Sequence, residues 1–209
     1  AMARVGRGLD GKIPVGKLIL LIRPAQTATA EMQVAAAEVE IAATARADRA
    51  ARNLAAIAKA IIGYHDTYRC FPPAMLIGPD GRGWHSWRVL ILPFFDDPAM
   101  QALRNRYAFD EPWDGPRNKQ LLDPMPDVYA DEPEGKPADS FTRYAAITGA
   151  GTMFSPDGVA FDPAAKPLRL GHGVLMKDFQ DAASSTLMVG TLTDAARIPW
   201  TKPEDVVVG

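Results

Sequence analysis

Trp84, His85 and Trp113 are the side chains of this sequence best suited to hold a ligand. An indole ring stacks on a sugar or packs on a peptide side chain, and an imidazole can both donate and accept hydrogen bonds. The three positions therefore predict a candidate cleft that binds a glycan or a peptide. Buried aromatic anchors are the alternative, because a partly apolar tryptophan usually packs in the core of its domain.

Catalysis has less support. A triad would have to draw on one of three histidines, which are His65, His85 and His172. The aspartate that follows His65 is its neighbour in sequence, and such neighbours do not face each other on a helix. No G-x-S-x-G elbow surrounds Ser86, and a hydrolase would need Ser86 or Cys70 within about 3 Å of a histidine. We predict a non-enzymatic protein without catalytic residues.

Metal and cofactor sites are not predicted either. Cys70 is the single cysteine, so no internal disulfide or cysteine-rich zinc site is possible, and we expect a buried thiol. The glycine-bearing stretch 78–83 lacks the spacing and the lysine of a phosphate-binding loop and predicts a turn. Three acidic groups offer oxygen ligands for calcium without EF-hand spacing and predict solvated surface charge: Asp110–Glu111, Asp123 with Asp127, and Asp131–Glu132.

Length and charge limit the partners. A chain of 209 residues can bury one core, and a net charge of −2 offers no field for nucleic acid or for an anionic membrane surface. The most apolar run, Ile13–Ile22, is about half of the ~20 residues that span a bilayer. Residues 1–24 predict a tail, a linker or a short strand, and we expect membrane anchoring only if a further segment precedes Ala1 in the natural protein.

A long helix is predicted over residues 25–70. This stretch is rich in alanine, the strongest helix former, and contains no glycine or proline from residue 25 to residue 62. Leu54, Ile57, Ile61 and Tyr64 recur at helical spacing, with Ile62 beside them, so one face must pack on a core. At 1.5 Å per residue the helix would reach about 65 Å. We expect part of it to project, to bend or to pair with another chain.

Residues 71–209 predict a globular α+β head. The helical spacing of Trp84, Trp87, Leu90 and Ile91 favours a short helix at residues 84–92. Proline and capping signals favour two more, at residues 98–107 with Asp97 or Asp96 as the cap, and at residues 116–123 with Asp114 as the cap. Further along the chain, short β-branched runs between turn residues predict an antiparallel sheet. Its strands are expected at 143–148, 158–161, 173–176 and 186–193, with Trp200 packed back on the sheet.

Five ordered blocks carry a resemblance to a known family. They are residues 53–74, 83–95, 109–122, 144–154 and 198–206, beginning with NLAAIAKAIIGYHDTYRCFPPA. In these blocks the chain resembles the planctomycete family called domain of unknown function 1559, which is pilin-like and also labelled solute-binding-protein-like. The resemblance implies a long N-terminal helix on an antiparallel sheet and an extracytoplasmic location in the cell envelope. The sequence departs from the family in lacking a prepilin-type leader, and the glutamate expected in the last strand is absent at Val189–Gly190.

Together these observations predict a pilin-like α+β domain. We expect a structural or assembly module of the cell envelope that contacts protein subunits through its long helix. The rival hypothesis is an extracytoplasmic binding module for a glycan or a peptide.

Overall fold

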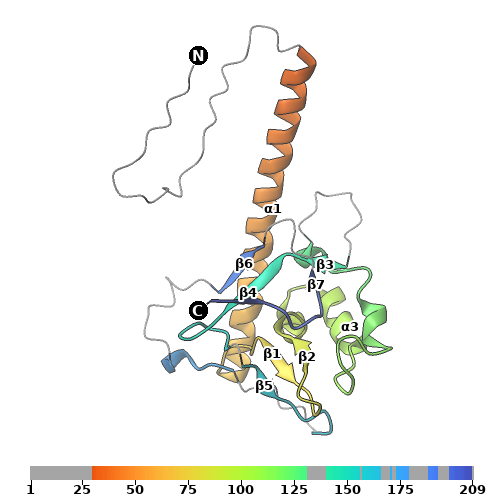
Figure 1. Ribbon diagram of the computed structural model, residues 1–209, viewed down its shortest axis with the longest axis vertical. Helices are drawn as coiled ribbons and strands as arrows, with labels where there is room; N and C mark the ends of the chain where they lie inside the picture. Colours follow the sequence, from red (N-terminus) through yellow and green to blue (C-terminus); the bar gives the residue numbers. More distant parts are fainter. Residues whose placement is uncertain are drawn as a thin grey trace, which may run out of the picture. The chain divides into compact units, whose positions relative to one another are not determined.

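The computed structural model describes residues 30–130, 140–155, 157–165, 170, 173–178, 188–192 and 198–208. The chain separates into two units, Ala1–Glu40 and Ile41–Gly209. The described part of the first unit is helical, and the second unit contains every other element (Figure 1). The expected tail or strand over residues 1–24 lies outside the described residues, as does the predicted helix start at residues 25–29.

The long helix α1 spans Ala30–Tyr68 without a break, as predicted. Its end is set by Arg69, whose φ of 61° is left-handed and whose N–H donates to the carbonyl of His65 at 2.7 Å. Cys70 and the Phe71–Pro73 segment follow, and all of them are buried. The two prolines therefore lie inside the domain and direct the chain away from the helix axis.

One face of α1 packs on the core of the second unit. Ile57, Ile61 and Tyr64 have no exposed surface, and Leu54 is half-buried. This confirms the predicted apolar face. Ile62, however, is 52% exposed, because it lies outside the buried stripe and faces solvent.

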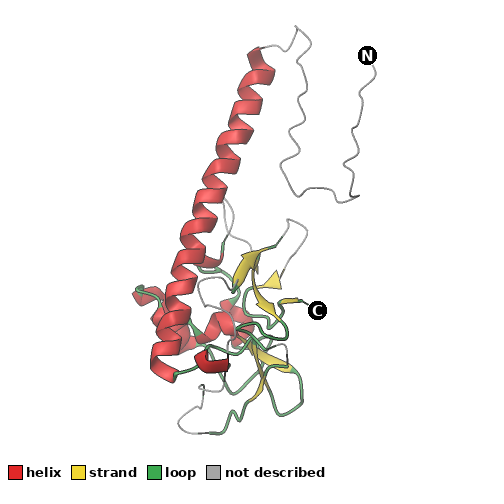
Figure 2. Cartoon of the chain, turned by 90° about the vertical axis from the view of Figure 1, so that its left-hand side faces the viewer, coloured by secondary structure: helices red, strands yellow, loops and turns green. Residues whose placement is uncertain are grey.

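The β-structure consists of small separate sheets, which lie to one side of α1 (Figures 1 and 2). Sheet orders are β2-β1-β5, β3-β7 and β6-β4-β8. β1 pairs with β5 and β4 pairs with β8 in parallel, whereas the other pairings are antiparallel. The prediction of one antiparallel sheet is therefore wrong in two respects: the described strands form separate sheets, and two of their pairings are parallel. The strands are β1 Met75–Ile77, β2 Gly83–Ser86, β3 Phe141–Thr142, β4 Tyr144–Thr148, β5 Val159–Ala160, β6 Val189–Thr191, β7 Ile198–Pro199 and β8 Val206–Val207.

The second predicted short helix is confirmed as α3, Pro98–Arg106, which is capped by Asp97 through the N–H of Ala99 at 2.8 Å. The first is wrong over its beginning, because residues 83–86 pair with β1 as a strand and only α2, Trp87–Leu90, is α-helical. The third predicted helix, at residues 116–123, contains only a short 3₁₀ turn, η2 Asn118–Leu121. The remaining 3₁₀ turns are η1 Leu92–Phe94, η3 Asp127–Tyr129 and η4 Met176–Asp178.

Two further predictions are corrected by local hydrogen bonds. Asp114 does not cap the third element; the carboxylate of Glu111 accepts from the N–H groups of Arg117 and Asn118 at 2.7 and 2.8 Å. The predicted strand at residues 173–176 is a loop that leads into η4. Of the strand expected at 186–193, residues 186, 187 and 193 lie outside the described residues, and β6 covers Val189–Thr191 of the rest.

A buried ion pair joins the end of the chain to the core. Arg88 is fully buried, and its guanidinium donates twice to the carbonyl of Tyr144 and once to Asp205, at 2.9 Å. Asp205 also accepts from the indole N–H of Trp87 at 3.0 Å and from the N–H of Ala146 at 2.8 Å. These bonds connect α2, β4 and the segment before β8, so they fix the register of elements that are far apart in sequence.

Trp200 is fully buried, and its ring stacks on Tyr129 of η3 at a ring-centroid distance of 5.7 Å. The described fold is α+β, with a long N-terminal helix, small and mainly antiparallel sheets, and a few short helices.

Candidate functional site

The predicted tryptophan pair lies together at the β1–β2 turn. The N–H of Trp113 donates to the carbonyl of Trp84 at 2.9 Å, and both side chains are half-buried. The indole of Trp84 packs across Gly78, where any Cβ would lie 2.2 Å from the ring, and its N–H donates to Asp80 at 2.8 Å. The structure therefore brings the two tryptophans together, held by the turn that the glycine-bearing stretch predicted.

His85 does not join them at the surface. It has no exposed surface, because the rings of Tyr107, Phe109 and Phe161 pack against its imidazole. Its Nδ1 lies 3.0 Å from the hydroxyl of Tyr107, and its ring contacts Phe109 and Phe161. Burial, together with the smaller effect of the positive charge of Arg104, lowers the pKa of His85 to about 4. The imidazole is therefore neutral at neutral pH and out of reach of a ligand.

The nucleophile candidates have structural partners. The Ser86 hydroxyl accepts from the N–H of Arg88 and caps α2. Cys70 is 1% exposed, and its sulfur accepts from the N–H of Gly173 at 3.4 Å, so the predicted buried thiol is confirmed. His172 lies outside the described residues.

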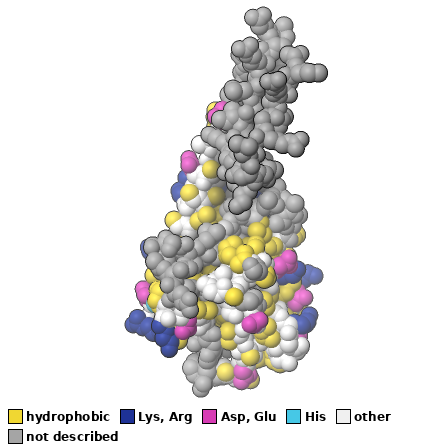
Figure 3. Space-filling view, turned by 60° about the vertical axis from the view of Figure 1, so that its left-hand side comes forward, with side chains coloured by type: hydrophobic (Ala, Val, Ile, Leu, Met, Phe, Trp, Pro, Cys, Tyr) yellow, Lys and Arg dark blue, Asp and Glu magenta, His cyan; other side chains and the backbone are white. Residues whose placement is uncertain are grey.

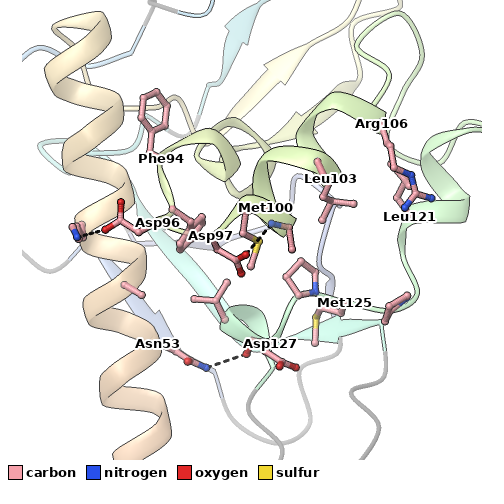
Figure 4. Close-up of a pocket in the computed structure, with 18 of the residues that line it drawn as sticks. Asn53, Phe94, Asp96, Asp97, Met100, Leu103, Arg106, Leu121, Met125 and Asp127 are labelled. Atoms are coloured by element: carbon pink, nitrogen blue, oxygen red, sulfur yellow. Dashed lines mark hydrogen bonds and ion pairs between the residues drawn. The ribbon is translucent and has the colours of Figure 1, made fainter.

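A cleft of about 1110 Å³ opens between α1 and α3 (Figure 4). The segment from Gln120 to Val128 closes its third side. Ligand pockets commonly measure about 300–1,000 Å³, so the cleft is large enough for a small molecule or a short peptide. Its lining includes Arg49, Arg52, Asn53, Ala56, Lys59, Phe94, Asp96, Asp97, Leu103, Arg106, Asp123 and Asp127.

The floor of this cleft is apolar. Phe95, Met100, Leu121 and Met125 line it, and each is at most 7% exposed. Met100 comes from α3, whose start is fixed by the Asp97 cap, and the other three come from the flanking turns. Methionine side chains adapt to differently shaped apolar groups, so the floor suits a ligand with an apolar side chain.

The rim of the cleft carries charges of both signs. Lys59 pairs with Asp96 and lowers the pKa of that carboxyl, and Arg49 lies 4.0 Å from Asp127. Arg52 and Arg106 have no ion-pair partner within the described part of the chain. Figure 3 likewise shows acidic and basic side chains interspersed on the visible face of the molecule.

Asn53 connects α1 to the far wall at the lower end of the cleft in Figure 4. Its amide donates to the carbonyls of Ala130 and Asp127, at 2.9 and 3.4 Å, and to the hydroxyl of Tyr144 at 3.2 Å. These bonds hold η3 and β4 against the helix and set the width of the cleft at this end.

A line of exposed residues on the side of α1 opposite its buried stripe is a second candidate surface, which we call the outer face; two of its members, Arg52 and Lys59, also line the cleft. Its members follow one line along the helix at alternating steps of four and three residues, and every one of them is exposed. Ile41 and Ile62 are 68% and 52% exposed. The outer face consists of Ile41, Ala45, Asp48, Arg52, Ala55, Lys59, Ile62 and Asp66.

Among the helices that the structure describes, none is long and apolar enough to cross a membrane. The described residues also contain no cluster of three or more histidine, cysteine or acidic side chains that could hold a metal ion.

The fold defines the class of this chain: an α+β domain with a long N-terminal helix and several small sheets. Its sequence matches the family described as proteins of unknown function (DUF1559) over residues 42–206, and the chain belongs to this family. The match begins inside α1 and covers almost all of the second unit. No curated protein and no solved structure matches the chain.

Proposed function

We propose that this chain is a non-enzymatic assembly module of the cell envelope, similar in role to pilins or pseudopilins, which contacts neighbouring subunits through α1. The observation that carries the proposal is the exposed outer face. A helix that only supports its own domain needs one apolar stripe, and α1 already buries that stripe through Ile57, Ile61 and Tyr64. Ile41 and Ile62 lie on the opposite side, with small alanines between them.

The composition of the outer face suits contact with another helix. Ala45 and Ala55 allow a second backbone to approach closely, and the two isoleucines offer apolar surface at both ends of the stretch. The envelope location rests on the resemblance to pilin-like proteins.

Light scattering of the full chain, measured after size-exclusion chromatography over a range of concentrations, tests the proposal. We expect a mass above that of the monomer, and we expect Ile41→Asp with Ile62→Asp to return the protein to a monomer. Val207→Asp is the matched control, because Val207 is 70% exposed on β8 and lies outside α1. A wild-type chain that stays monomeric at every concentration would contradict the proposal.

A binding function is the second candidate, and the α1–α3 cleft is the observation that favours it. The apolar floor suits a peptide that has an apolar side chain near a carboxylate, because the rim carries Arg52 and Arg106, which have no ion-pair partner among the described residues. A glycan would instead use the half-buried rings of Trp84 and Trp113.

Tryptophan fluorescence separates the two ligands, because no tryptophan lines the cleft. Envelope oligosaccharides that bind at the β1–β2 turn should quench the emission, and Trp113→Phe should reduce that quenching. A labelled acidic peptide that binds in the cleft should gain anisotropy, and Leu103→Glu should abolish this gain. If neither ligand class binds, the binding function is refuted.

A further inference from the structure

We propose that two copies of this chain pair through their outer faces with the two α1 helices antiparallel. This inference rests on the proposed assembly function and specifies its partner and its geometry. The evidence is the order of the apolar, small and charged residues along the outer face.

The first observation is the spacing. Ile41, Asp48, Ala55 and Ile62 follow each other at intervals of seven residues, which is the repeat that keeps a line of side chains against a partner helix. Read backwards, this line again begins and ends with isoleucine. An antiparallel partner therefore places Ile41 beside the partner's Ile62, and Asp48 over the small side chain of the partner's Ala55.

The second observation is the charge. Among the described residues neither Asp48 nor Arg52 has an ion-pair partner, although both are exposed on the same helix. In the antiparallel arrangement Asp48 lies one turn or less from the partner's Arg52. The twofold axis repeats this contact, since an isologous interface forms each contact twice.

The parallel alternative is disfavoured by the same charges. Two α1 helices side by side in the same direction and in register would place Asp48 against the partner's Asp48 and Arg52 against the partner's Arg52. Like charges at such distances repel, and this repulsion selects against the wrong orientation. Lys59 has Asp96 as a partner in its own chain, so Arg52 is the cation available for the interface.

Sedimentation velocity on the full chain tests the pairing through a charge swap. Asp48→Arg should raise the dimer dissociation constant by about tenfold, because it creates two like-charge contacts in each dimer. Arg52→Asp should do the same, and Asp48→Arg with Arg52→Asp should restore the wild-type affinity. Asp114→Arg is the control, as it makes the same charge change at an exposed position outside α1.

Cysteine crosslinking tests the orientation independently. Ala51 lies beside the proposed twofold axis, opposite the partner's Arg52, so Ala51→Cys should form a disulfide-linked dimer. Ala55→Cys should not, because the axis places it against the partner's Asp48. The wild-type chain is the control: its single cysteine is Cys70, so any disulfide-linked dimer that it forms comes from that residue.

The outcomes separate the two proposals. A dimer that the charge swap does not restore, or in which Ala55→Cys crosslinks as readily as Ala51→Cys, overturns the antiparallel pairing and leaves the assembly function standing. A chain that does not self-associate overturns both.

Discussion

Removal of Asp205 should destabilise this protein more than any substitution on its surface. The carboxylate accepts from Arg88, Trp87 and Ala146, at 2.9, 3.0 and 2.8 Å, and its side chain is 6% exposed. Burial raises the pKa of Asp205, and the charge of Arg88 opposes that rise. Each of the two buried charges is therefore stabilised by the other. Removal of either residue leaves the remaining charge in the core without its counterion.

The expected magnitude follows from what Asp205→Ala leaves behind. Arg88 would keep its bonds to the carbonyl of Tyr144 and would lose its only buried counterion among the described residues. Breaking a buried pair by removing one partner costs about 3–5 kcal/mol, because the other charge stays in a poorly solvated place. This is a large part of the total stability of a domain, which is about 5–15 kcal/mol.

Urea unfolding followed by far-UV circular dichroism measures this loss, since that signal does not depend on the environment of Trp87. Asp205→Ala should lower the free energy of unfolding by about 3–5 kcal/mol. In the double variant Arg88→Met with Asp205→Ala, the loss of stability should be smaller than the sum of the losses in the two single variants, because no unpaired charge remains.

Glu204→Ala is the matched control: Glu204 pairs with Lys202 at the surface, and its removal should cost at most about 1 kcal/mol. If Asp205→Ala costs under about 1 kcal/mol, or if the two single losses are additive, the reasoning is wrong.

Two further predictions concern the core and the cleft. The pKa of His85 is about 4 in the folded protein, against an ordinary value of 6.5. As the pH falls from above 6.5 toward 4, the unfolded chain therefore binds a proton at this residue before the folded chain does, and the free energy of unfolding decreases. Between pH 7.5 and pH 5 this residue should cost about 2 kcal/mol, and His85→Gln should remove that part of the pH dependence in urea titrations at both pH values. Asn53→Ala removes the hydrogen bonds to Ala130 and Tyr144 and should cost about 1–2 kcal/mol, whereas Ala55→Ser on the exposed side of the helix should change stability by less than about 0.5 kcal/mol.

The long helix could be predicted because its determinants are local. Alanine propensity and the spacing of Ile57, Ile61 and Tyr64 operate within one segment, so the helix and its buried face followed from the sequence alone. The Asp97 cap is a local signal of the same kind.

The strands were harder to predict because their pairing is not local. Trp84 and Trp87 stand at helical spacing, yet residues 83–86 form β2 because β1 offers its edge across the turn. Residues 206–207 have no sequence signal beyond a short valine run, and they become a strand through parallel pairing with β4. Tertiary contacts override local preference in such short segments.

The candidate binding surfaces also differ in how far the sequence alone could predict them. The tryptophan pair could be proposed from the sequence, but the burial of His85 behind it depends on Tyr107, Phe109 and Phe161, which the fold brings together. The cleft could not be predicted, because its walls come from α1, from α3 and from the segment after η2.

By itself the sequence determined an α+β domain with a long alanine-rich helix, one buried thiol, and family membership through blocks that lie in order along the chain. Only the tertiary structure decided which side of that helix stays exposed, where the cleft opens, and how Arg88 meets Asp205 across 117 positions of sequence. The reason is physical: helix formation and capping depend on neighbours within a few residues, whereas burial, strand pairing and charge pairing depend on which distant segments share a core.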